Sequence, residues 1–295
     1  MSIKEFIINI SKPILTPITR FVLKRHYQAS RPLTEVGKAR KVLVLAPHMD
    51  DETIGAGGTL HKHTQTGAEV YCVFVTDGSN SVSDLDKTEL TAARKNEINQ
   101  VQGIIGFKDV YYMDLPDGKV KSNNESQEKL KSIIEKIQPD LIYCTPFVDA
   151  HPDHVATGEI LSDTLRQMNY SCMVRLYEIN CPIPPDEINC IIDISDTLKY
   201  KKQAIDVFSS QAIAFDGFIE LNYIKTELAA TASITAVEGF LELDSSSYYR
   251  QFSRLKEEGY DYTKLFKQAN RTATLLWAVY QNYKLKKQIY QKRLN

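Results

Sequence analysis

The sequence lacks the features that mark secreted and membrane-spanning proteins. Cysteine is scarce: the 295 residues include five, an odd number, with no Cys-x-x-Cys spacing. Buried thiols in a reducing compartment are therefore a better interpretation than a disulfide framework. No apolar run approaches the roughly 20 residues of a membrane span. The first residues, interrupted by Pro13 and Pro17, make a poor secretion signal. These absences predict a cytoplasmic protein.

Net charge is also small, at −1, but its distribution is uneven. Residues 1–41 carry nine Lys/Arg against two acids, for a net +7, and residues 264–295 carry eight and no acid, for +8, which leaves −16 for residues 42–263. The basic ends also carry apolar and aromatic stripes, made of Ile3, Phe6, Ile7, Ile10, Ile14, Ile18 and Phe21, and of Leu276, Trp277, Tyr280, Tyr283, Tyr290 and Leu294.

Two interpretations of these ends remain open. Apolar residues with a basic face suit peripheral contact with an anionic membrane surface. Alternatively, the stripes pack on the acidic body or on another subunit, as in a homo-oligomer. We favour packing, because protein cores use such stripes more often than membranes do. Nucleic acid is not an expected partner, since the basic residues belong to no recognisable binding module.

What the sequence does contain is an alternation of short apolar runs and amphipathic helical windows. With 43% hydrophobic and 25% charged residues, the chain is long enough for one large α/β core with appendages. We expect strands at 41–47, 69–76, 109–114, 140–146, 174–180 and 190–194, and helices at 54–66, 91–106, 126–137, 154–168 and 196–210. This pattern predicts a Rossmann-like, mostly parallel sheet with helices on both faces. The predicted units are a basic extension (1–39), the α/β domain (40–243) and a helical basic extension (244–295).

The residues suited to chemistry follow the first and fourth predicted strands. His48, Asp50 and Asp51 come after the first strand, and His151-Pro152-Asp153-His154 comes after the fourth. With the strand order 3-2-1-4, these strands are neighbours, and a ligand is expected in the crevice at their carboxyl ends. By itself, an Asp-Asp-Glu run is often only a favourable helix N-terminus, and a lone loop histidine is usually solvated. Their coincidence at adjacent strand ends favours a functional site.

Two imidazoles and a carboxylate, from His48, Asp51 and His154, form a donor set suited to Zn²⁺ with a fourth position for water. Zinc there would lower the pKa of bound water and polarise a carbonyl. Asp50, beside the ligands, is the expected general base. His151 is the expected acid or oxyanion donor, and Asp153 the residue that holds His151 in one tautomer.

The segments His48-x-Asp50-Asp51-Glu52 and His151-Pro152-Asp153-His154 resemble the two signatures of the LmbE-like (PIG-L) N-deacetylases. Weaker resemblances are Arg94-x-x-Glu97, Asp114-Leu115-Pro116-Asp117-Gly118, Lys202 to Gln211 and Val237-Glu238-Gly239-Phe240, so that the likeness covers roughly residues 40–243. The resemblance implies a Rossmann-like zinc enzyme that acts on N-acetylglucosamine-type substrates. It implies zinc on His48, Asp51 and His154. Arg94 is a candidate for contact with substrate or with a carboxylate of the site, the alternative being a surface ion pair. Asp117 is a candidate for substrate binding, the alternative being a purely structural role in the turn before Gly118. Met49 departs from the family's usual proline, and a less rigid turn is expected there.

The predicted activity is removal of an N-acyl group, most simply acetyl, from a small amino sugar or glycan precursor, by zinc-bound water that Asp50 activates. Two alternatives stay open: another metal-dependent hydrolase such as a phosphoesterase, for which two close metal ions are expected, and a catalytically silent carbohydrate-binding protein. Gly55-Ala56-Gly57-Gly58 lacks the spacing of a dinucleotide loop, and helix-to-sheet packing is the better interpretation.

Overall fold

The structure of the protein, a computed structural model, describes residues 3–80, 83, 85–210 and 214–291. Within that part, seven strands form a sheet in the order β3-β2-β1-β4-β5-β7-β6. Their bounds are β1 (Lys41–Ala46), β2 (Glu69–Thr76), β3 (Asp109–Leu115), β4 (Leu141–Cys144), β5 (Met173–Leu176), β6 (Cys190–Asp193) and β7 (Val237–Asp244). Strands β1 to β5 pair in parallel, and β7 runs antiparallel to β5 and β6. The predicted mostly parallel α/β fold is confirmed.

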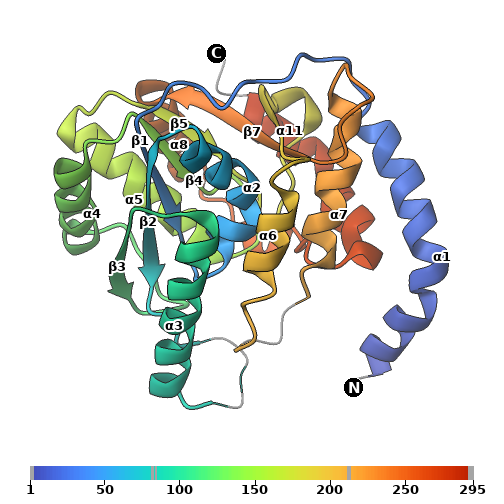
Figure 1. The fold of residues 1–295 in the computed structure, drawn as a ribbon, viewed down its shortest axis with the longest axis horizontal. Coiled ribbons are helices and arrows are strands. Elements are labelled where there is room, and N and C mark those ends of the chain that lie inside the picture. Colours follow the sequence, from blue (N-terminus) through green and yellow to red (C-terminus); the bar gives the residue numbers. More distant parts are fainter. Residues whose placement is uncertain (1–2, 81–82, 84, 211–213, 292–295) are drawn as a thin grey trace.

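The helices fall into two packed groups on either side of this sheet (Figure 1). On one side, α2 (Asp51–Gln65), α3 (Lys87–Ile105) and α6 (Leu198–Ile205) contact one another. On the other side, α5 (Pro152–Met168) contacts both α4 (Asn124–Ile137) and α8 (Ser245–Glu258). The remaining helices are α1 (Ile3–His26), α7 (Asp216–Ile224), α9 (Tyr262–Leu265), α10 (Leu275–Tyr280) and α11 (Tyr283–Gln291). Three short 3₁₀ turns are η1 (Pro185–Glu187), η2 (Lys225–Leu228) and η3 (Thr272–Thr274).

Local sequence explains where the first helices begin and end. A capping box at Asp86 and Glu89 begins α3, and Gly106, in the left-handed conformation, ends it. Pro152 occupies the first turn of α5, where its missing N–H costs nothing, and His151 is the N-cap. His154 therefore lies in the first turn of α5, which follows β4 after the loop 145–151.

The glycine run of α2 serves close packing, as expected. A side chain at Gly55 would come within 2.1 Å of the Tyr177 ring, and one at Gly58 within 2.9 Å of Ile194. Strand β1 is buried beneath this helix from Val42 onward. Helix α2, which begins at Asp51, is thus held tightly against the sheet.

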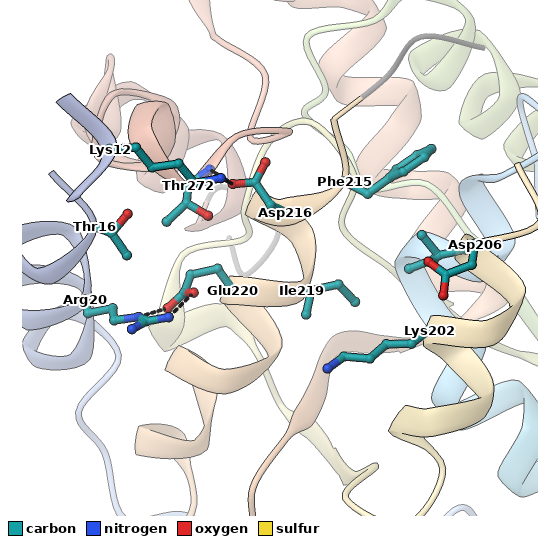
Figure 2. Close-up of a pocket in the computed structure, with 11 residues that line it drawn as sticks. Lys12, Thr16, Arg20, Lys202, Asp206, Phe215, Asp216, Ile219, Glu220 and Thr272 are labelled. Carbon is teal, nitrogen blue, oxygen red and sulfur yellow. Dashed lines mark hydrogen bonds and ion pairs between the residues drawn. The ribbon is translucent and has the colours of Figure 1, made fainter. Parts of the chain in front are cut away.

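The basic N-terminal segment packs on the acidic body through ion pairs. Figure 2 shows Lys12 and Arg20 of α1 reaching toward Asp216 and Glu220 of α7, with nitrogen–oxygen distances of 3.2 and 2.6 Å. These residues line a cavity of about 520 Å³ between α1, α6 and α7.

The apolar stripe of α1, by contrast, does not make this contact. Ile14, Ile18 and Phe21 are 69%, 48% and 62% exposed, while Leu23 is buried. The side chains of Ile3, Phe6, Ile7 and Ile10, and residue Leu294, lie outside the described part. The structure thus favours packing of the N-terminal end on the body, although by other residues than the stripe.

Two further expectations can be compared with the structure. All five cysteines are free and buried. Among the described residues, no helix is both long enough and apolar enough to cross a bilayer. The proposed unit boundaries at residues 39 and 243 stay predictions.

Some predicted elements differ from those observed; the strand expected at 174–180, for example, ends at Leu176. The helix expected at 196–210 ends at Ile205, and Gln211 lies outside the described residues. No strand was expected at 237–244, where β7 pairs with both β5 and β6. Because β7 enters the sheet between two earlier strands, local periodicity alone does not reveal it.

Candidate active site

The two histidine motifs meet at one edge of the sheet. β1 and β4 pair in parallel, with Val44 opposite Tyr143, so that both strands end on the same side. The first motif follows β1 and forms the start of α2, and the second follows β4 and forms the start of α5. The topology therefore brings together side chains about 100 residues apart in sequence, as the strand order 3-2-1-4 predicted.

Three side-chain atoms form a nearly equilateral triangle at this edge. His48 Nδ1, Asp51 Oδ2 and His154 Nε2 are each 3.2 Å from the other two. For tetrahedral zinc with bonds of about 2.0–2.1 Å, ligand atoms lie roughly 3.3 Å apart. The triangle thus has the size of three vertices of a tetrahedral zinc site, and the side chains of Asp51 and His154 are only 4% and 2% exposed.

The electrostatics of the cluster favour a cation. Burial alone would lower the pKa of His154, but Asp149 and Asp51 outweigh it and raise that pKa to about 10. Burial likewise opposes charge on His48, yet its pKa is raised well above the usual value by hydrogen bonds to Asp117, Asp153 and Asp51. These carboxylates therefore draw positive charge onto the imidazoles, and a divalent cation can supply that charge in place of the protons.

Carboxylates also face the outer nitrogens of both histidines. His48 Nε2 lies 3.4 Å from Asp117 Oδ1 and 3.4 Å from Asp153 Oδ2. His154 Nδ1 lies 3.3 Å from Asp149 Oδ2. Such partners keep the proton on the outer nitrogen and leave the inner nitrogen free to bind a metal.

Asp149 was not expected from the sequence. Its carboxylate accepts the backbone N–H of His151 at 2.8 Å and two N–H groups of Asn180, at 3.1 and 2.8 Å. The side chain is completely buried. The sequence feature that could have pointed to Asp149 is an acidic residue directly after the apolar pair Phe147-Val148 and two residues before the histidine motif.

The role expected for Asp153 needs correction. We expected its carboxylate to hold His151, but that carboxylate accepts the N–H groups of Gly118 and Val120, at 2.7 and 3.1 Å, and faces His48. His151 is instead contacted by the backbone N–H of Asp153, which donates to His151 Nδ1 at 3.2 Å. Because Asp153 occupies the first turn of α5, its side chain turns toward the loop after β3 rather than toward the N-cap residue.

His151 lies beside the other two histidines, with its ring centroid 4.7 Å from that of His48 and 5.1 Å from that of His154. Burial, together with those two neighbours, lowers its pKa to about 4, so His151 is neutral at neutral pH. Since Nδ1 accepts a hydrogen bond, the proton of the neutral ring resides on Nε2. His151 can therefore act as a hydrogen-bond donor.

Two other sets of side chains place ligand atoms close enough to share an ion. One is His48, His151 and His154, and the other is His48, Asp117 and Asp153, with atoms within 4.8 Å of one another. The contacts of 3.2 Å favour Asp51 over His151 as the third ligand. The carboxylates of Asp117 and Asp153 both face His48 Nε2. In that position they can accept its proton in a hydrogen bond and orient the His48 ring as a metal ligand.

Arg94 of α3 lies beside Asp50 of the first motif. Asp50 is 4% exposed, and its Oδ1 lies 4.0 Å from a guanidinium nitrogen of Arg94. Arg94 is itself 1% exposed and donates to the backbone carbonyls of Gly78 and Met49, at 3.2 and 3.3 Å. Arg94 thus supports the turn that carries Met49 and Asp50, and a substrate contact by Arg94 stays a prediction.

Asp117 comes to the site from the loop after β3. Its Oδ1 faces His48 and its Oδ2 accepts the N–H of Asn80 at 3.1 Å. Its expected contact with substrate likewise stays a prediction. All eight residues expected at the site are therefore gathered around the ends of β1 and β4, with Arg94 and Asp117 supplied by α3 and the loop after β3.

Comparison with known proteins finds similar sequences among deacetylases. The GlcNAc-PI de-N-acetylase (PIG-L) family model matches residues 43–165. A diacetylchitobiose deacetylase from Thermococcus kodakarensis is 27% identical over 204 residues, which cover 64% of this chain and 75% of that protein. A probable N-acetyl-α-D-glucosaminyl L-malate deacetylase 2 from Bacillus anthracis is 29% identical over 134 residues, which cover 43% of this chain and 59% of that protein.

Solved structures of other proteins are similar to this chain as well. The N,N'-diacetylchitobiose deacetylase from Pyrococcus horikoshii superposes with a TM-score of 0.60 at 28% identity, over 72% of this chain and 86% of that one. A 4-carboxy-2-hydroxymuconate hydratase from Pseudomonas putida shares the fold, with a TM-score of 0.58 at 16% identity over 69% of this chain and 96% of that one. Residues 43–165, which contain both motifs, thus match the PIG-L family model, and the relatives of similar sequence named here are deacetylases, as the resemblance of the motifs predicted.

Proposed function

We propose that the protein is a zinc-dependent N-deacetylase that removes the acetyl group from the nitrogen of a small amino sugar. The observation that carries this proposal is the triangle of His48 Nδ1, Asp51 Oδ2 and His154 Nε2, with edges of 3.2 Å. Its donors and its size fit tetrahedral zinc with one vertex left for a small ligand. The deacetylases among its relatives support an N-acetylated sugar as the substrate.

His48, Asp51 and His154 would hold zinc, which would supply a Lewis acid able to acidify water and polarise an amide carbonyl. The protein supplies the groups that move protons and stabilise charge. Asp50, next in sequence to Asp51, accepts the proton of the attacking water as the new carbon–oxygen bond forms. The Arg94 guanidinium, 4.0 Å away, holds this carboxylate in place.

His151 stabilises the negative charge that develops on the carbonyl oxygen. Its neutral ring carries a proton on Nε2 and can donate it in a hydrogen bond without ionising. When the carbon–nitrogen bond breaks, the proton held by Asp50 passes to the departing nitrogen. The products are acetate and a free amino sugar.

The proposal also includes the location of the protein and its partners. Five buried, free cysteines suit a reducing compartment, which supports a cytoplasmic location. The ion pairs of Lys12 and Arg20 with the body reduce the positive charge that α1 could offer to a membrane. We therefore retain a small N-acetylated sugar as the proposed partner, and neither a membrane nor a nucleic acid.

The test is acetate release from a panel of substrates by the zinc-loaded protein. The panel contains N-acetylglucosamine, N,N'-diacetylchitobiose, N-acetylglucosaminyl malate and N-acetylglucosaminyl inositol, with a phosphate monoester and the hydratase substrate as alternatives. We expect acetate from at least one N-acetyl sugar and no product from the last two. Zinc binding with no acetate from any of them would favour the carbohydrate-binding alternative, and phosphate release would favour a phosphoesterase.

A further inference from the structure

The loop that carries the second motif is covered by the C-terminal segment of the chain. Phe147 is completely buried, and its ring lies 5.9 Å from Tyr248, 5.1 Å from Phe252 and 5.9 Å from Tyr290, between ring centroids. Tyr248 and Phe252 belong to α8, and Tyr290 belongs to α11. This aromatic cluster lies two residues from Asp149, which faces the metal-binding histidine.

The same segment holds the helix that carries His154. The Tyr248 hydroxyl donates to the carbonyl of Gly158 in α5 at 2.9 Å. A side chain at Gly158 would come within 2.3 Å of the Phe252 ring, so α5 and α8 are in close contact. Such tight packing leaves α5 little freedom to shift along or away from α8.

A second contact reaches the segment of Asn180, whose N–H groups bind Asp149. Lys286 of α11 is 1% exposed, and its ammonium group donates to the carbonyls of Ala278 and Pro182, at 3.1 and 3.5 Å. Pro182 follows Asn180, whose two N–H groups bind Asp149. The C-terminal segment therefore contacts both loops that determine the position of the Asp149 carboxylate.

The connection from Asp149 to the metal-binding triangle is direct. One carboxylate oxygen faces His154 Nδ1 at 3.3 Å, and the other accepts the His151 N–H at 2.8 Å. In addition, the Thr145 hydroxyl donates to the carbonyl of His154 at 2.7 Å. A movement of the loop 145–151 would thus displace the ring of His154 and also the Nε2–H group of His151.

We infer that α8 and α11 of the C-terminal segment take part in the active centre, in which Phe252 and Tyr290 are positioning residues for the loop that carries Asp149, His151 and His154. Both helices lie outside the family match at 43–165 and in the segment expected to be an appendage. The inference rests on the proposed function for its effect on turnover, but its effect on zinc binding can be measured without any substrate.

The experiment compares Tyr290→Leu and Phe252→Leu with Tyr262→Leu. Tyr262 is a matched control, because it is also a buried aromatic residue of the same segment, at 6% exposed, but its ring neighbours are Tyr260 and Phe266. All three variants are expected to lower the melting temperature. At a temperature where each is folded, zinc affinity is measured by competition with a chelator, and kcat and KM by acetate release.

Tyr290→Leu and Phe252→Leu should weaken zinc binding about tenfold, the lower end of the range for changes beside metal ligands. They should also lower kcat about tenfold or more with little change in KM, because misplacement of catalytic groups acts on the chemical step. Tyr262→Leu should leave all three quantities at the wild-type values. Tyr290→Phe, which keeps the ring, should restore zinc affinity and kcat.

If both leucine variants bind zinc and turn over as Tyr262→Leu does, the inference is overturned while the proposed function stands. If the wild type binds no zinc, the proposed function fails, and the inference fails with it. Should the leucine variants not fold, Tyr248→Phe removes only the hydroxyl that donates to Gly158. It should weaken zinc binding about threefold, as the loss of one hydrogen bond implies, and an unchanged affinity would overturn the inference.

Discussion

Replacing Asp149 with asparagine should weaken zinc binding although Asp149 touches no metal. In the structure its two carboxylate oxygens accept three N–H groups, from His151 and Asn180, and one of them faces His154 Nδ1 at 3.3 Å. An asparagine has only one acceptor oxygen. In either orientation of the amide, its NH₂ group meets an N–H donor of this set.

The magnitude follows from these contacts. If the NH₂ group faces His154, it can donate to Nδ1 and drive the ring proton to Nε2, the nitrogen needed for zinc. If it faces His151 and Asn180, buried N–H groups lose their acceptor and the loop shifts. Changes of this kind beside metal ligands typically cost 10- to 100-fold in affinity, which corresponds to about 1.4–2.7 kcal/mol.

The assay is competition for zinc with a chromophoric chelator at neutral pH. Asp163→Asn is the control, because Asp163 lies on the same helix, α5, with a carboxylate paired to Arg166 at 3.2 Å near the surface. That change should leave zinc affinity within about a factor of two, because the partners of Asp163 are Arg166, Ser122 and Lys256, none of which belongs to the metal site. Equal zinc affinity in Asp149→Asn and Asp163→Asn would refute the role assigned to Asp149.

Three other predictions follow from the site and its surroundings. Asp50→Asn should abolish acetate release while zinc stays bound, whereas His154→Ala should lose both; metal loss in Asp50→Asn would contradict its role as base. Zinc affinity should rise with pH, by about tenfold per pH unit for each proton displaced, because the pKa of His154 in the metal-free protein is raised to about 10. Protonated His154 also stabilises the metal-free fold. That stabilisation is complete below the unfolded-state pKa, near 6.5, and is lost as pH rises toward 10. A flat affinity across this range would contradict the protonated cluster. Lys201→Met should lower the free energy of unfolding by about 3–5 kcal/mol in urea titration, because it removes the buried ion-pair partner of Glu238. Lys62→Met, at a more exposed pair with Asp196, should lower it by at most about 1 kcal/mol. Similar losses of unfolding free energy in the two variants would contradict this account.

The fold and the meeting of the two motifs could be predicted because local patterns determine both. Continuous apolar runs such as Val42 to Ala46 are typical of strands covered on both faces. Right-handed crossovers then place the first and fourth strands side by side. His48 and His154 lie in the segments that follow those strands, so the pairing of β1 with β4 is enough to bring them together.

What could not be predicted depends on contacts between distant segments. β7 enters the sheet antiparallel between β5 and β6, which no local repeat indicates. Asp149 faces His154 from a loop that is bonded to Asn180 and packed against the C-terminal helices, which are contacts between segments distant in sequence. The carboxylate of Asp153 turns to His48 because backbone N–H groups of Gly118 and Val120 capture it. Each of these features follows from tertiary packing rather than from spacing along the chain.

The most direct test of the central claim is the position of zinc in crystals of the zinc-loaded protein, from anomalous scattering at the zinc absorption edge. We expect one strong peak, about 2.0–2.1 Å from His48 Nδ1, Asp51 Oδ2 and His154 Nε2. A main peak elsewhere, for example between His48 Nε2, Asp117 and Asp153, or no peak near these residues, would contradict the account.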